Sequence, residues 1–181
     1  MLVVDQMSSK SLQQYLSVID PILFPVLKTL RRSLSGLSWA ISGDLAMYLY
    51  SYSSSLPSVN LPNPEIQIVV QISDSSDVSR LEAVLQDLRQ HGFVEEDRTS
   101  DHVCLHYPLL STHIKISYRK AALPVVWMRN LKGKSTYPLL EPMAVMEHKR
   151  KQINVMNKVE RLTEWDTYNW MKDVVNHVII E

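Results

Sequence analysis

The stretch that decides the fold runs from LSWAISGDLAMYLYSY at residues 37–52 to EIQIVVQI at residues 65–72. Its first five residues are apolar and lead into a Ser-Gly pair at residues 42–43, which predicts a short buried strand that ends in a tight turn. Residues 44–52 then predict a helix. In EIQIVVQI the side chains alternate between two faces with a period of two, which is typical of a β-strand.

Outside this stretch, the same periodicities predict further helices and strands. An amphipathic pattern that includes Val78, Leu81, Leu85 and Leu88 predicts a helix that ends near Gly92. The expected helices span residues 11–19, 21–35, 76–91, 142–157 and 161–180, and the expected strands span 93–96, 102–107, 113–118 and 124–128.

This order of elements predicts an α/β (α+β) fold, with one mixed β-sheet of about five strands flanked by helices. We expect N-terminal helices at residues 1–36 to pack on an α/β core at residues 37–128. Residues 129–181, with two long helices, are expected to form a C-terminal helical segment of the same domain.

Composition and charge limit the classes of function. The 181 residues are 45% hydrophobic and 21% charged, which is typical of a globular protein. Nineteen basic residues balance 19 acidic ones, so the net charge does not support binding to nucleic acid. No apolar run is long enough for a membrane helix, and the N-terminus lacks a secretory signal pattern. We therefore expect a soluble, cytoplasmic protein with no membrane partner.

The only cysteine is Cys104, so the chain can form no intrachain disulfide and no cysteine cluster for zinc. Its apolar neighbours predict a small buried core residue. The alternative is a nucleophilic thiol, because His102 and His106 would share its face of a strand. The six histidines show no metal-binding spacing.

Residues 37–72 resemble the core of the nucleotidyltransferase superfamily, in which a strand, a glycine turn and a helix precede a strand with two carboxylates. The segment HIKISY at residues 113–118 corresponds to the strand that bears a third carboxylate in that family. The C-terminal region is similar to minimal transferases related to abortive-infection toxins, with Lys149, Lys172 and Asp173 at matching positions. The resemblance covers residues 37–180 and implies a nucleotidyltransferase-like fold.

In that family the carboxylates hold Mg²⁺, which prefers oxygen ligands, and the glycine turn approaches the phosphates. This chain keeps Glu65 at the first carboxylate position but has Gln67 at the second. Lys115 and Ser117 occupy the face where the third would lie. Asp44, at the helix start, would cap the helix and fill the anion site. These departures predict that metal-dependent transfer is lost.

The resemblance also implies a set of site residues. The remnant catalytic candidates are Glu65 and Asp44, which would be the metal ligands if the site were active. No other metal or cofactor is expected. The candidate nucleotide-binding residues are Ser42, Gly43, Gln67, Lys115, Ser117, Lys149 and Lys172.

Structural explanations compete with these roles. Glu65 fits an exposed strand start, Lys149 fits a surface lysine whose stem packs on apolar neighbours, and Lys172 fits an ion pair on its own helix. The alternating tyrosines at residues 48–52 cannot all face one side of a helix. At least one of them is expected to be exposed, where it could contact a protein partner.

Three functions remain open at this point. The first is a degenerate nucleotidyltransferase-like module that binds a nucleotide or a protein without catalysis. The second is an active Mg²⁺-dependent transferase with an altered site. The third is an unrelated α/β interaction protein, in which the strands EIQIVV and HIKISY would not be neighbours.

Overall fold

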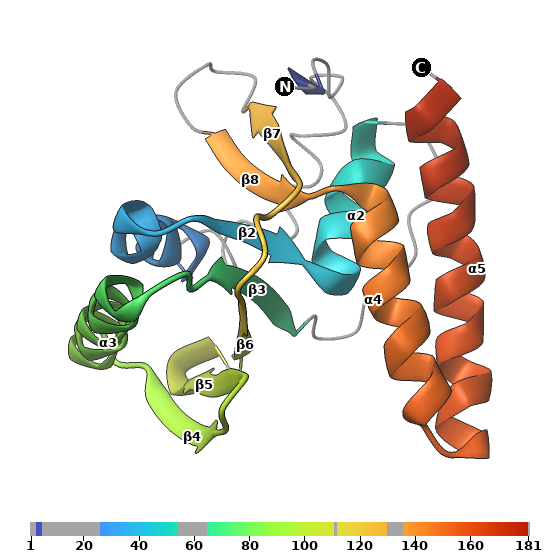
Figure 1. Ribbon diagram of the computed structural model, residues 1–181. Coiled ribbons are helices and arrows are strands. Elements are labelled where there is room, and N and C mark those ends of the chain that lie inside the picture. Colours follow the sequence, from blue (N-terminus) through green and yellow to red (C-terminus); the bar gives the residue numbers. More distant parts are fainter. Residues whose placement is uncertain (1–2, 5–25, 54–64, 111, 130–135, 181) are drawn as a thin grey trace.

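The structure is a computed structural model that describes residues 3–4, 26–53, 65–110, 112–129 and 136–180 (Figure 1). The strands are β1 Val3–Val4, β2 Trp39–Ser42, β3 Ile66–Gln71, β4 Val94–Arg98, β5 His102–Tyr107, β6 Thr112–Arg119, β7 Val125–Arg129 and β8 Thr136–Leu140. Residues 26–33 are helical. The other helices are α2 Gly43–Ser53, α3 Ser75–Gln90, α4 Pro142–Val155 and α5 Lys158–Ile180, with short 3-10 turns at Leu34–Gly36 and Pro108–Leu110.

The α/β architecture expected from the sequence is confirmed. The expected helix at residues 11–19 lies outside the described residues. Two long C-terminal helices follow the sheet, also as expected.

The mixed sheet is wider than the expected five strands. Its order is β1-β7-β8-β2-β3-β6-β5-β4, which makes eight strands, of which β1 has only two residues. Two of these strands were not expected: β1 lies in the range predicted to form N-terminal helices, and β8 lies in the range predicted to form the C-terminal helical segment. The central residue of β8, Pro138, lacks a backbone N–H and is unusual inside a sheet, so the segment does not read as a strand. Leu139 nevertheless pairs with Ile41 of β2.

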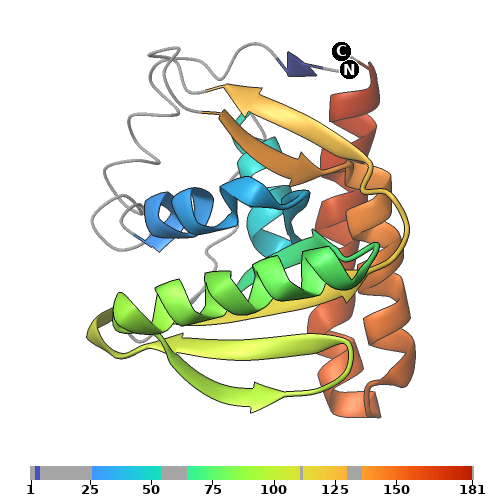
Figure 2. The same cartoon turned by 60° about the vertical axis from the view of Figure 1, so that its left-hand side comes forward.

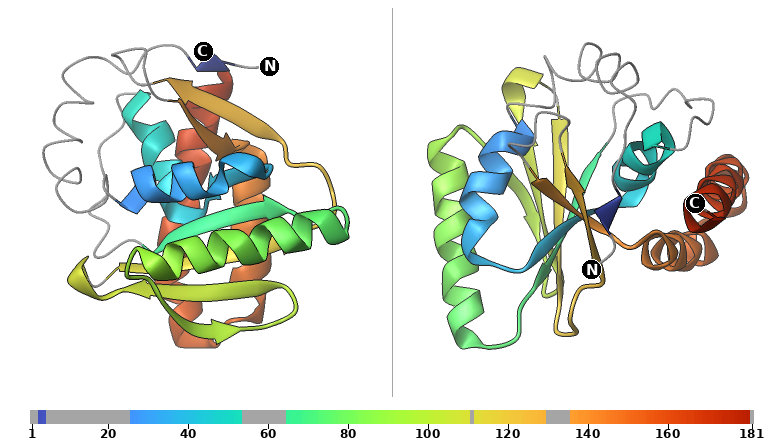
Figure 3. Two further views of the ribbon diagram at one scale, coloured as in Figure 1. Left: turned by 90° about the vertical axis from the view of Figure 1, so that its left-hand side faces the viewer. Right: turned by 90° about the horizontal axis from the view of Figure 1, so that it is seen from above.

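Helices cover both faces of the sheet. Seen from above, α3 and the helix at residues 26–33 lie on one side, while α2, α4 and α5 lie on the other (Figure 3). The packing of α3 along the sheet is also clear in Figure 2. Leu81, Leu85 and Leu88 of α3 are buried, as expected, but Val78 is 47% exposed, so the covered stripe starts one turn later.

Of the three alternating tyrosines of α2, only Tyr50 has a described side chain. Tyr50 is fully buried, and its hydroxyl donates a 2.9 Å hydrogen bond to the carbonyl of Leu140 at the end of β8. Burial, with a smaller contribution from Glu141, raises the pKa of Tyr50 above its ordinary value. The side chains of Tyr48 and Tyr52 lie outside the described residues, so the idea of a tyrosine partner surface stays a prediction.

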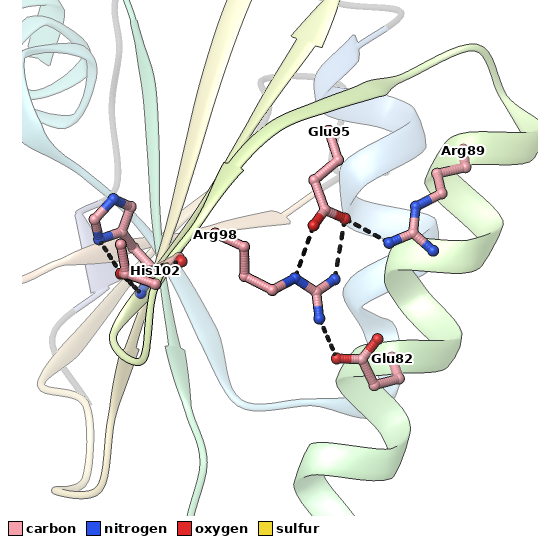
Figure 4. A network of polar contacts seen from close by, with 6 residues as sticks. Glu82, Arg89, Glu95, Arg98 and His102 are labelled. Atoms are coloured by element: carbon pink, nitrogen blue, oxygen red, sulfur yellow. Dashed lines mark hydrogen bonds and ion pairs between the residues drawn. The ribbon is translucent and has the colours of Figure 1, made fainter.

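A network of ion pairs at the surface joins β4 to α3 (Figure 4). Arg98 donates to Glu82 at 2.6 Å and to Glu95 at 2.8 Å, and Arg89 also pairs with Glu95. These hydrogen bonds, that of Arg98 first, lower the pKa of Glu95. Because the groups are exposed, the network orients the hairpin more than it stabilises the protein.

Candidate functional site

The two strands that carry the candidate site are neighbours. Strand β3 pairs with β6 in parallel, with Gln67 beside Lys115 and Val69 beside Ser117. The neighbour relationship predicted from the sequence is therefore present. An unrelated interaction protein was expected to lack this neighbour relationship, so the third alternative loses the feature that would have distinguished it.

Polar side chains cross the sheet in one row at this level. Ser42 of β2 lies opposite Gln67, which lies opposite Lys115, which lies opposite Cys104 of β5. Residues directly opposite one another in neighbouring strands point to the same face. A hydroxyl, an amide, an ammonium and a thiol therefore share this face, and the carboxylate of Asp97 on β4 continues the row beyond Cys104.

Cys104 is partly exposed, not fully buried as expected, and Asp97 of β4 lies opposite it as the next residue of the row. Burial raises the pKa of its thiol, although Lys115 opposes this shift. His102 and His106 do share its face, but a raised pKa keeps the sulfur in the less nucleophilic thiol form.

The turn at Gly43 lies against the Gln67 side chain. Gly43 has a φ of +66°, in the left-handed region, and begins α2. A Cβ atom at this position would lie 2.5 Å from Gln67 Oε1. The left-handed backbone conformation therefore favours glycine, and a larger residue would also require the flexible Gln67 side chain to move. The amide of Gln67 fills the room beside the turn.

Ser42, just before this turn, is 2% exposed, and its Oγ has no hydrogen-bond partner among the described residues. Glu65 is exposed immediately before β3. Within the described parts of the chain, no group of three or more histidine, cysteine, aspartate or glutamate side chains could hold a metal ion.

Lys149 is the most unusual residue of the site. It lies on α4 and is 6% exposed, so it is not the surface lysine of the structural explanation. Its Nζ lies 3.1 Å from Asp44 Oδ1 and also pairs with Glu164 of α5. Burial alone would lower the pKa of Lys149, but the two carboxylates, Asp44 first, outweigh burial and raise it. The lysine is therefore charged and joins α2, α4 and α5.

Asp44 lies in the first turn of α2, after Gly43, and its carboxylate is held by Lys149. Because α2 begins at Gly43, Asp44 lies inside the first turn and not at the capping position expected for it. Lys172 is exposed on α5, and within the described residues no hydrogen bond or ion pair joins it to this site. Their roles toward a nucleotide stay predictions.

Three functional candidates were not found from the sequence. Glu164 completes the pairing of Lys149. Arg119 of β6 places its Nη2 3.5 Å from His148 Nδ1 on α4, so an unprotonated Nδ1 can accept from it. The sequence could have indicated Arg119, because Lys115, Ser117 and Arg119 occupy every second position of one strand and so share a face. Nothing local signals Glu164 or His148.

The fold and this arrangement together define a class, the α/β proteins with a nucleotidyltransferase-like fold. No protein-family model and no curated protein matches the sequence. Among solved structures, the chain is similar to the antibiotic-resistance factor ANT(2'')-Ia, with 8% identity, a TM-score of 0.52 and coverage of 84% of this chain and 88% of that one. A second structure of ANT(2'')-Ia, in complex with adenylyl-2''-tobramycin, has 8% identity, a TM-score of 0.50 and coverage of 84% and 94%.

The Megavirus polyadenylate synthase is similar with 12% identity and a TM-score of 0.53, over 94% of this chain but 34% of that one. Such low identities show a shared fold and leave the activity of this chain open. None of the described helices combines the length and the apolar character that a membrane span requires.

Proposed function

We propose that this chain is a degenerate nucleotidyltransferase-like domain that binds a nucleotide or a protein without metal-dependent nucleotidyl transfer. The observation that carries the proposal is the charge arrangement of the site. Gln67 and Lys115 lie side by side where carboxylates would hold a cation, and the ammonium of Lys149 already neutralises Asp44.

The physical argument rests on what Mg²⁺ requires. It needs near-octahedral oxygen coordination at about 2.0–2.1 Å and takes carboxylates as its protein ligands. An amide is a weaker ligand than a carboxylate, and a neighbouring lysine repels a dication. The remaining acid near the turn, Asp44, has a lysine Nζ at 3.1 Å. A dication would have to displace that ammonium from a buried pair.

The ligand side of the proposal rests on the same face. In this row, the partly exposed Gln67 and Lys115 offer hydrogen-bond donors and one positive charge, which suit a phosphate or an acidic protein surface. Ser42 lies beside them but is buried. The likeness to abortive-infection toxin-type transferases, carried by Lys149, Lys172 and Asp173, also belongs to this proposal. A cytoplasmic location stays a prediction from the sequence.

A transfer assay tests the proposal directly. The protein is incubated with each radiolabelled nucleoside triphosphate and Mg²⁺ or Mn²⁺, in the presence of aminoglycoside, RNA and protein acceptors. We expect no metal-dependent labelling and no pyrophosphate release, with Glu65→Ala indistinguishable from the wild type. Metal-dependent labelling that Glu65→Ala abolishes would establish the alternative, an active transferase that uses Glu65 and Asp44.

A further inference from the structure

Strand β6 presents three hydrogen-bond donors along one face. Lys115, Ser117 and Arg119 occupy alternate positions, so their Cα atoms are spaced by about 6–7 Å and their side chains point the same way. All three are partly buried and partly exposed. A strand face with an ammonium, a hydroxyl and a guanidinium can surround an extended chain of oxyanions.

Neither cation of this face forms an ion pair within the described residues. Asp97 of β4 lies in the same row as Lys115, on the far side of Cys104. Glu147 of α4 interacts with the charge of Arg119, but its carboxylate is bound to Lys151 at 2.9 Å. Asp44 and Glu164 pair with Lys149. Because none of these carboxylates contacts Lys115 or Arg119, the donors of both cations are available to a ligand.

His148 of α4 lies beside this face and can accept a hydrogen bond from Arg119. It is half-buried beside Arg119, at 3.5 Å between Nη2 and Nδ1. Burial lowers the pKa of His148, and so do Arg119 and Lys115 from β6 and Lys151 and Lys149 from its own helix. The carboxylates on α2 and α5 nearest to this helix, Asp44 and Glu164, are bound to Lys149. An anion bound beside Arg119 would favour a protonated His148.

From this geometry we infer that Lys115, Ser117, Arg119 and His148 form an anion site that binds the polyphosphate of a nucleotide without a divalent cation. This inference rests on the proposed function, because it assigns a ligand to the same face. The fixed cations of the protein take the place of the metal that neutralises phosphate charge in a metal-dependent site. Binding would be accompanied by uptake of a proton at His148.

Isothermal titration calorimetry with ATP and with inorganic tripolyphosphate, both in EDTA, tests this site. We expect both to bind, ATP at least as tightly, with lower affinity as salt rises. Arg119→Gln and Lys115→Gln should each weaken binding by about tenfold or more, the value for losing a charged hydrogen bond. The matched control is Arg80→Gln on α3, an arginine whose side chain is 60% exposed. It should bind like the wild type.

Titrations at pH 6 and pH 8 in two buffers of different ionisation enthalpy measure the proton uptake. Because the phosphates of both ligands also take up protons in this range, each titration is repeated with His148→Gln, and the wild type should take up more protons on binding than this variant. Circular dichroism confirms that each variant is folded.

The inference is overturned if neither anion binds at millimolar concentration, if binding requires Mg²⁺, or if Arg119→Gln binds like Arg80→Gln. It is equally overturned if only an RNA oligonucleotide without a terminal phosphate binds. Metal-free binding together with metal-dependent labelling would instead refute the proposed function and leave the anion site standing.

Discussion

Replacement of Lys149 by methionine is the sharpest perturbation that the structure offers. Methionine keeps much of the side-chain volume and removes only the charge. It leaves Asp44 and Glu164 facing the same point without a cation between them. Truncating one partner of a buried pair costs about 3–5 kcal/mol. Both carboxylate side chains are 31% exposed, so water relieves part of this and we expect about 3 kcal/mol.

Urea denaturation measures the free energy of unfolding of Lys149→Met. Because the loss arises from two stranded carboxylates, the triple variant with Asp44→Asn and Glu164→Gln should recover most of it. Added Ca²⁺ should stabilise Lys149→Met more than the wild type, since two carboxylates can then share a cation. A loss below about 1 kcal/mol, or one that the triple variant does not reduce, would refute this account of the site.

The same pair predicts a pH dependence of stability. The pKa of Lys149 is raised in the folded protein above its ordinary value of 10.5. The folded state therefore keeps its proton where the unfolded chain has lost it. The stabilisation is complete below pH 10.5 and declines as the pH rises from there through the folded pKa. The free energy of unfolding of the wild type and of Lys149→Met, measured against pH, gives this contribution as the difference between the two curves.

Three further changes test other parts of the structure. Gly43→Ala should destabilise the protein by at least about 1–2 kcal/mol in urea, because of its left-handed conformation and the contact with Gln67. In the double variant Gly43→Ala, Gln67→Ala, only the part of this loss that comes from the contact with Gln67 should be recovered. Tyr50→Phe should cost about 1–3 kcal/mol, because it strands the carbonyl of Leu140, and an unchanged denaturation midpoint would contradict that. The pKa of His148 is lower in the folded protein than its ordinary value of 6.5, so as the pH falls the unfolded chain takes up this proton before the folded protein does. This residue therefore makes the free energy of unfolding rise with pH up to 6.5. In His148→Gln that part of the pH profile should flatten.

The proposed function combines a nucleotidyltransferase-like fold with polar side chains that do not suit a divalent cation. In the described residues, the turn at Gly43 and the neighbouring strands β3 and β6 are present. The side chains beside them include an amide at Gln67 and cations at Lys115 and Lys149. A fold can persist after its site changes, because the buried residues Ile66, Ile68 and Ile116 stabilise it independently of the polar face.

The sequence alone determined most of the elements, because helical and strand periodicities are local. The alternation in EIQIVVQI and HIKISY was enough to place Gln67, Lys115 and Ser117 on polar faces. Only the tertiary structure decided which charges meet. Lys149 and Asp44 are separated by 105 residues, and their pairing depends on how α4 crosses α2. The contact of Arg119 with His148 and the insertion of β8 beside β2 likewise depend on long-range packing, which no local pattern encodes.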